Sequence, residues 1–348
     1  MATLVAWILV FGVLVAVHEF GHFAMAKGMD MRVDEFSLGF GPALWATRRG
    51  ETEYAVRLIP LGGYVRLAGM DRIGEEVGPR DPRAFPERPL WQRFLVIGAG
   101  PLMNLVLAAV LYAAVFGLVG VPQPTTVVGR TLPQYPAYAA GIRPGDQIVA
   151  IGGQPVETWP EVQSLIAAHA RQSFTVTIVR DGQRREVTVA TRYDPNQRAY
   201  IIGIQPTMAV VRMGPLQALA SGVGHTWQLT RVWFITLAQL VTGRGGFDVA
   251  GPVGIAVMVG QAAQAGWSQL MLLAAALSAN LGLFNILPVP VLDGSRLFLL
   301  GLEGVRRRAL DPGRESMIHM VGMVVLLLFV VLVTYHDITT LLLKRPAF

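Results

Sequence analysis

The sequence contains no cysteine, and this absence limits both its covalent chemistry and its metal chemistry. A disulfide framework and thiolate ligands are excluded, so a transition-metal site must be built from histidine and carboxylate side chains. Charged residues are also scarce, at 15% of the chain, whereas 53% of the residues are apolar. This imbalance is typical of an integral membrane protein.

The net charge of +6 is spread over the segments between the apolar stretches. It does not form a basic run studded with aromatic residues, and no nucleic-acid-binding module is visible. We therefore expect no nucleic-acid partner, and we interpret the basic residues as orientation signals in the membrane.

A helix needs roughly 20 mostly apolar residues to cross the hydrocarbon core of a bilayer. The first candidate stretch has neither a basic residue ahead of it nor a small-residue cleavage site, so we interpret it as a retained span and not as a signal peptide. We predict a polytopic α-helical membrane protein with about four transmembrane helices, at residues 4–23, 94–121, 267–287 and 318–335.

Basic residues gather in the loops after the first and third spans, as in Lys27, Arg32, Arg296 and Arg306. The positive-inside rule then places residues 24–93 and the third connection on the cytoplasmic side, and residues 122–266 outside. We divide the chain into four parts. Residues 1–121 contain two spans, an HExxH motif at residues 18–22 and a cytoplasmic-side β-hairpin, and residues 122–207 form an α+β PDZ domain. Residues 208–266 form an amphipathic membrane-surface segment, and residues 267–348 contain two spans and an LDG motif at residues 292–294.

The PDZ assignment depends on residues 137–156, which resemble the PDZ signature of bacterial membrane and periplasmic proteases. Short β-branched runs around the turn Arg180-Asp181-Gly182 support a small soluble domain. PDZ domains bind extended peptides beside a loop whose backbone amides hold a carboxylate, so peptide C-termini are possible partners. The expected loop is Ile201, Ile202, Gly203 and Ile204; the alternative is a gate that blocks bulky proteins without binding any peptide.

The segment His18-Glu19-Phe20-Gly21-His22 places three ionisable residues inside the first apolar stretch. Two histidines four residues apart share one helical face, so both can bind one metal ion while Glu19 approaches its bound water. Each ionisable group in a membrane helix costs on the order of 3 kcal/mol, which a divalent cation would compensate. Hydrogen bonding within a helix bundle, or a proton or ion path, is the alternative.

Two histidines leave a catalytic zinc site one protein ligand short. Pro288 and Pro290 break the third span, and Asp293 follows in an otherwise apolar run. Both motifs lie toward the cytoplasmic ends of spans that run in the same direction. We predict that His18, His22 and Asp293 meet at one metal ion; a helix-stop signal is the alternative role of Asp293.

These residues resemble the site-2 protease family of intramembrane metalloproteases, especially its bacterial RseP and RasP type, which is defined by HExxH and LDG motifs. Two departures are Ser295, where a second glycine usually follows LDG, and the single PDZ domain, where the RseP type has two. The resemblance extends over nearly the whole chain, through residues 35–42, 59–65, 100–104, 251–255 and 285–295.

The resemblance implies a zinc metalloendopeptidase with Glu19 as general base and Zn²⁺ as cofactor. Asn285 and Asn104 would belong to the substrate-binding residues: Asn285 would help to position the substrate backbone, and Asn104 would pack near the site. The implied setting is regulated intramembrane proteolysis in the lipid bilayer of the bacterial cytoplasmic membrane. Its substrates would be single-span membrane proteins, either trimmed anti-sigma factors or remnant signal peptides.

Residues 54–67 have strand character on either side of a turn at residues 60–63. An exposed strand edge can pair with an unwinding substrate, so we expect Gly62, Gly63 and Tyr64 to contact it. The alternative is a hairpin that merely caps the helices. Two other functions compete with proteolysis: a metal-ion transporter, which does not explain the PDZ signature, and an inactive adaptor, which does not need Glu19.

Overall fold

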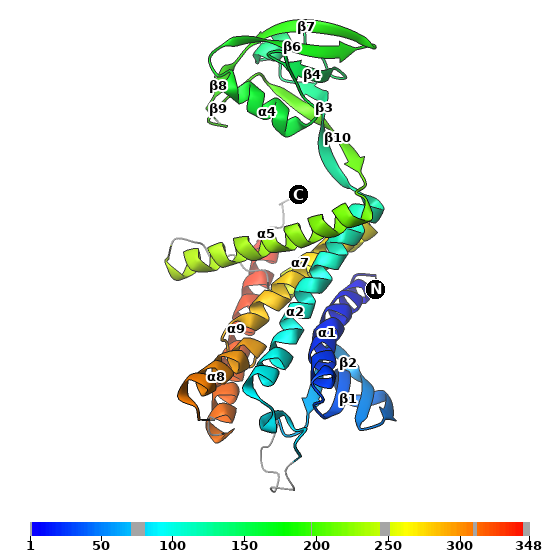
Figure 1. Ribbon diagram of the computed structural model, residues 1–348, viewed down its shortest axis with the longest axis vertical. Coiled ribbons are helices and arrows are strands. Elements are labelled where there is room, and N and C mark those ends of the chain that lie inside the picture. The colour runs from blue at the N-terminus through cyan, green and yellow to red at the C-terminus, as the bar shows by residue number, and fades with distance from the viewer. Residues whose placement is uncertain (1, 71–80, 196, 244–250, 309–311, 344–348) are drawn as a thin grey trace. The chain divides into compact units, whose positions relative to one another are not determined.

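The computed structural model describes residues 2–70, 81–195, 197–243, 251–308 and 312–343, which form two compact units (Figure 1). The first unit contains residues 1–117 and 214–348, and the second contains the inserted residues 118–213. Each unit has its own hydrophobic core.

Among the described residues of the first unit, four helices are long and apolar enough to cross a membrane. They coincide with the four stretches predicted from the sequence. A short 3-10 turn, η1 (Phe85–Glu87), precedes the second of them, and a π-helical turn, η2 (Val115–Val119), follows it. The four helices are α1 (Ala2–Gly28), α2 (Leu90–Ala114), α7 (Trp267–Ile286) and α9 (Pro312–Leu343).

Close backbone contacts hold α2 between α1 and α7. A Cβ atom at Gly21 of α1 would lie 2.5 Å from the carbonyl oxygen of Ala99, and one at Gly282 of α7 would lie 2.7 Å from that of Pro101. Real side chains do not tolerate such distances, so glycine is required for this packing. The two motif-bearing segments of the chain are thereby brought against one central helix.

The strands β1 (Val33–Arg49) and β2 (Thr52–Leu67) pair with each other next to α1 (Figure 1). Glu35 of β1 lies opposite both Glu53 and Arg66, so the first half of β1 runs between the two arms of β2. The two arms run in opposite directions along the same stretch of β1, so the reversal predicted at residues 60–63 is present, but the arms pair with β1 and not with each other. A further turn lies between β1 and β2, at Gly50, which has a φ of +61°.

A buried carboxylate explains this insertion. The side chain of Glu35 is 3% exposed, forms an ion pair with Arg57 in the first arm of β2, and accepts a hydrogen bond of 2.6 Å from the Tyr64 hydroxyl in the second arm. Burial raises the pKa of Glu35, but the hydrogen bonds from Tyr64 and Arg57 lower it further and leave the pKa below its usual value. Both arms of β2 are thus tied to one charged group.

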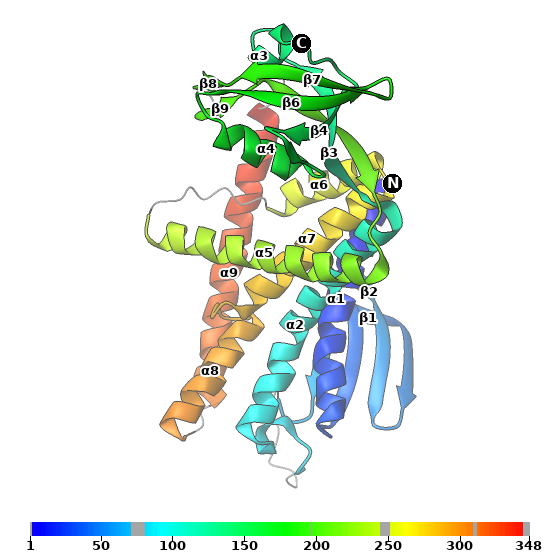
Figure 2. The same ribbon diagram turned by 45° about the horizontal axis from the view of Figure 1, so that its top comes forward.

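The helix α5 (Pro215–Val241) lies across α2 and α7 in both views (Figure 2). It corresponds to the segment expected to form an amphipathic helix, and large apolar side chains such as Trp227 are exposed on it. A shorter helix, α6 (Pro252–Ala265), begins at a carboxylate of α9: Asp337 accepts hydrogen bonds of 3.1 Å and 2.7 Å from the backbone N–H groups of Gly251 and Gly254.

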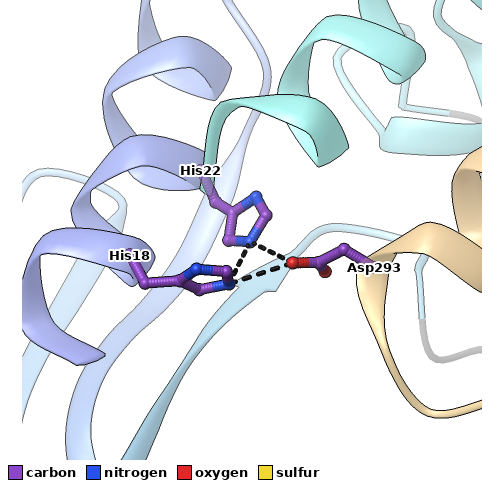
Figure 3. A group of neighbouring side chains, drawn as sticks. All are labelled: His18, His22 and Asp293. Carbon is purple, nitrogen blue, oxygen red and sulfur yellow. Dashed lines mark hydrogen bonds and ion pairs between the residues drawn. The ribbon is translucent and has the colours of Figure 1, made fainter. Parts of the chain in front are cut away.

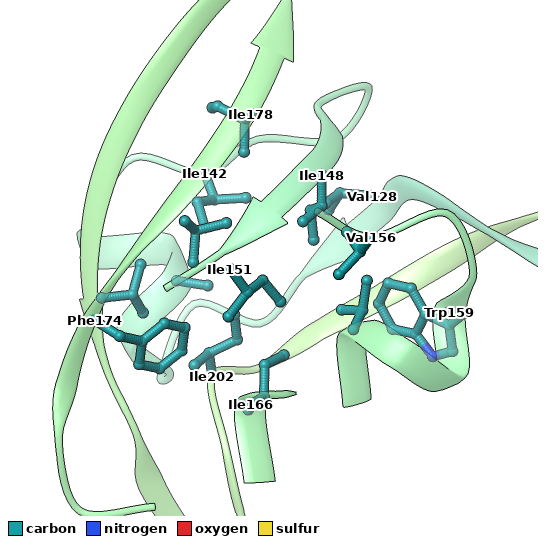
Figure 4. Packing of buried hydrophobic residues seen from close by; sticks show 14 residues of the cluster. Val128, Ile142, Ile148, Ile151, Val156, Trp159, Ile166, Phe174, Ile178 and Ile202 are labelled. Carbon is teal, nitrogen blue, oxygen red and sulfur yellow. The ribbon is translucent and has the colours of Figure 1, made fainter. Parts of the chain in front are cut away.

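The second unit is a small α+β domain. Its main sheet has the order β10-β3-β4-β6-β7, with β5 beside β4, and its core contains Ile148, Ile151, Phe174 and Ile202 (Figure 4). Asp181 and Gly182, at φ values of 52° and 77°, form the predicted turn between β6 and β7. The elements are β3 (Val121–Thr131), α3 (Pro136–Ala139), β4 (Gln147–Ile151), β5 (Gln154–Pro155), α4 (Trp159–Ala168), β6 (Ser173–Arg180), β7 (Gln183–Ala190), β8 (Arg192–Asp194), β9 (Ala199–Ile201) and β10 (Ile204–Val211).

Candidate active site

His18 and His22 project from successive turns of α1, and their imidazole rings converge on one point (Figure 3). Their Nε2 atoms lie 3.2 Å apart, and both residues are buried. The uninterrupted apolar run before them favours the helix, and the spacing of four residues places both rings on one face, as predicted.

Asp293 approaches the same point from the first turn of α8 (Asp293–Arg306). The preceding helix α7 ends at Ile286, because Pro288 and Pro290 cannot continue its hydrogen bonds. A Cβ atom at Gly294 would lie 2.2 Å from the carbonyl oxygen of Ile286. A glycine is therefore needed for α8 to begin so close to the end of α7.

The three side chains have the geometry and the chemistry of a metal site. Asp293 Oδ2 lies 2.9 Å from His18 Nε2 and 3.3 Å from His22 Nε2. Ligands about 2.1 Å from zinc in a tetrahedron lie about 3.4 Å from one another, close to these separations. Two imidazole nitrogens and one carboxylate oxygen also form a common ligand set of catalytic zinc.

Two contacts from α2 complete the surroundings of the histidines. The backbone of Gly100 faces both rings so closely that a Cβ atom there would lie 2.3 Å from His22 Nε2 and 2.9 Å from His18 Nε2. The Nδ1 atom of His22 lies 2.8 Å from the carbonyl oxygen of Val96, which fixes the proton on Nδ1 and leaves a lone pair on Nε2. The ring of His22 is thus held in the form that binds a metal.

These side chains line a cavity of about 280 Å³ that also contains the expected general base. Glu19 is half-buried in its wall, opposite residues of β2 such as Val65. The same cavity is lined by Tyr64, Val65, Leu67, Met70, Ile97, Asn285, Val291 and Arg296. Residues from α1, α2, β2, α7 and α8 therefore share one site.

The other expected site residues differ in where they lie. Tyr64 and Asn285 line the cavity, and Asn285 donates one amide hydrogen to the Leu281 carbonyl at 3.0 Å. Gly63 lies against Glu19, because a Cβ atom at Gly63 would be 3.1 Å from Cγ of Glu19. Gly62 instead lines a separate apolar groove with Trp7 and Phe11 of α1.

Two further groups lie outside the cavity wall. Asn104 is fully buried, and its amide contacts His18. The loop of Ile201, Ile202, Gly203 and Ile204 belongs to the second unit, where the Ile202 side chain is part of the core.

The sequence alone did not identify Gly100 or Arg296 as parts of the site. Arg296 had a usable signal, because it follows Asp293 by three residues on α8 and therefore faces the same side. Gly100 lies in a stretch that carries the family resemblance, but its closeness to the two histidines depends on the packing of α2 against α1.

A family model described as peptidase family M50 matches residues 6–329. The chain belongs to peptidase family M50. Among similar proteins, a zinc metalloprotease RasP from Geobacillus kaustophilus is 32% identical over 413 residues, covering 97% of this chain and 98% of the relative. The regulator of sigma-W protease RasP from Bacillus subtilis is 29% identical over 418 residues, covering 98% and 99%. These matches confirm the family predicted from the HExxH and LDG motifs.

Solved structures similar to part of this M50 peptidase include two PDZ domains. The PDZ domain of an SdrC-like protein from Listeria innocua is 21% identical, with 24% of this chain and 92% of that chain covered and a TM-score of 0.22. The PDZ domain of an SdrC-like protein from Listeria monocytogenes is 18% identical, with 24% and 88% covered and a TM-score of 0.22.

Proposed function

We propose that this M50 peptidase is an intramembrane zinc metalloprotease that hydrolyses peptide bonds within or near the membrane-spanning segments of other proteins. The observation that carries the proposal is the convergence of His18, His22 and Asp293 beside Glu19, within a group of helices apolar enough to span a membrane. Helices of this kind would place the site within the bilayer, where the membrane-spanning segments of other proteins are the polypeptides nearest to it.

His18, His22 and Asp293 are the proposed zinc ligands. Zinc held by these residues would polarise the scissile carbonyl group and lower the pKa of an attacking water. Glu19 accepts the proton of that water as general base and then donates it to the departing amine.

A membrane helix is a poor substrate until it unwinds, because its carbonyl groups are already hydrogen-bonded. We propose that the unwound segment pairs with the second arm of β2. Residues 63–67 pair with β1 along one edge, and Tyr64, Val65 and Leu67 line the cavity. Tyr64→Pro should abolish cleavage while zinc remains bound; cleavage at the wild-type rate would contradict this role.

The proposed orientation places the active site toward the cytoplasmic side of a bacterial inner membrane, with the second unit outside. The basic residues of the first and third connections support it through the positive-inside rule. In this orientation α5 would lie at the outer surface, where its exposed apolar side chains contact lipid. The proposed substrates are single-span proteins of the anti-sigma-factor or remnant-signal-peptide kind.

We propose a PDZ-type role for the second unit, which is either to bind peptides or only to restrict access to the active site. The strand β10 forms one edge of its main sheet and directly follows the loop of residues 201–204, so an extended peptide can add there. In the second role the unit only restricts access. Binding of a peptide with a free C-terminal carboxylate, compared with its amidated copy, distinguishes the two.

The proposal is tested by reconstituting the purified protein in vesicles with a tagged single-span substrate and mapping the products by mass spectrometry. Cleavage within the span is expected for the wild type and for Arg306→Gln, an exposed position near the end of α8, but not for Asp293→Ala. Cleavage confined to segments remote from the span would contradict an intramembrane site. Zinc binding without cleavage, accompanied by zinc flux into the vesicles, would favour the transporter function.

A further inference from the structure

Asn104 is completely buried in α2, yet it is not part of the cavity wall. Its backbone carbonyl oxygen accepts a hydrogen bond of 2.8 Å from Ser278 Oγ of α7. Its side-chain amide lies against the back of the His18 ring, with Nδ2 3.1 Å from Nδ1. Asn104 therefore reaches the candidate metal site through His18.

The chemistry of His18 requires an acceptor at this position. A histidine that binds a metal through Nε2 keeps a lone pair there, so its ring proton resides on Nδ1. At His22 the Val96 carbonyl oxygen accepts this proton. At His18 the Asn104 amide occupies the equivalent place, and its oxygen is the group of that amide able to accept.

The burial of the amide supports this pairing. Asn104 Oδ1 is buried without a hydrogen-bond partner among the residues that the structure describes. Amide oxygen and nitrogen exchange places when the group turns by a half rotation, and the hydrogen-bond network decides between the two orientations. Turning the amide brings Oδ1 to Nδ1–H of His18 and leaves Nε2 free to bind a metal.

We propose that Asn104 is a positioning residue, which accepts the Nδ1–H hydrogen bond of His18 and thereby sets the affinity of the site for zinc. This inference rests on the proposed zinc ligation and gives Asn104 a role other than substrate contact. Loss of such a partner of a metal-bound histidine typically weakens metal binding by about 10- to 100-fold.

The test is the zinc affinity of the purified full-length protein, measured by competition with a chromogenic chelator. Asn104→Leu has a similar volume but no acceptor, and its affinity should fall by about 10- to 100-fold. Asn104→Asp keeps an acceptor and should stay close to the wild type. Ser278→Ala is the control, because it removes a hydrogen bond to the same residue without touching the amide, and it should also stay close.

Equal zinc affinities of Asn104→Leu and the wild type would overturn the inference. Equal losses of zinc affinity in Asn104→Leu and Asn104→Asp would also overturn it, because they would mean that only the packing of residue 104 matters. Thermal unfolding of the zinc-free proteins checks that each variant folds, and Asn104→Ala replaces the leucine variant if that one does not. A wild type that binds no zinc would instead contradict the proposed function itself.

Discussion

Gly100→Ala should destroy the metal site while leaving the helix that carries it intact. The added Cβ atom would lie 2.3 Å from His22 Nε2 and 2.9 Å from His18 Nε2. Real Cβ atoms essentially never approach a heavy atom within 3.0 Å, so His22 must move by at least about 0.7 Å, the difference between the two distances. Metal–ligand distances tolerate only about 0.2 Å. We therefore expect zinc affinity to fall by more than about 100-fold, which is the largest loss typical when a residue that hydrogen-bonds to a metal ligand is removed.

Gly98→Ala is the matched control, two residues earlier on α2. A Cβ atom at Gly98 meets nothing within 4 Å among the described residues, and alanine favours a helix by up to about 1 kcal/mol over glycine. Zinc affinity is measured for both variants by chelator competition, and helix content by circular dichroism. Equal zinc affinities of Gly100→Ala and Gly98→Ala would contradict the close approach of Gly100 to the two histidines.

Two further predictions concern charges away from the metal site. Hydrogen bonds from Arg83 and Lys27 lower the pKa of Glu51 to about 2, so its contribution to stability is complete above its ordinary pKa of 4.5 and is lost as the pH falls toward 2. Glu51→Gln should therefore lower the melting temperature at pH 7 by more than at pH 3; a gap that does not change with pH would contradict the ion pairs. Asp337→Ala removes the acceptor at the start of α6 and should lower the melting temperature in detergent, with a smaller effect for Asp337→Asn; an unchanged melting temperature in both variants would show that this cap is not needed.

The candidate metal site could be predicted because ionisable groups are conspicuous in apolar segments. His18 and His22 share one helical face by their spacing, and Asp293 interrupts an apolar run after two prolines. Each would be costly in a membrane without a partner, and the structure brings the three together. The four long apolar helices followed from length and composition alone.

The remainder depended on contacts between distant residues. The insertion of β1 between the arms of β2 follows from the contacts of the Glu35 side chain with both arms. The alternation of apolar and polar residues along a strand cannot specify that pairing. The positions of Gly100, which faces the Nε2 atoms of the histidines, and of Asn104, on the Nδ1 side of His18, arise from the packing of α1 on α2. Local sequence patterns contain neither kind of information.

The most direct test of the account compares the wild type, Glu19→Gln and a chelator-treated sample for cleavage of a single-span substrate, with zinc content determined in each. Glu19 lies in the cavity beside the three proposed ligands without being one of them. Cleavage is expected from the untreated wild type alone, with zinc retained in Glu19→Gln at the wild-type level. Cleavage by Glu19→Gln, or a wild type that binds no zinc, would contradict the proposed function.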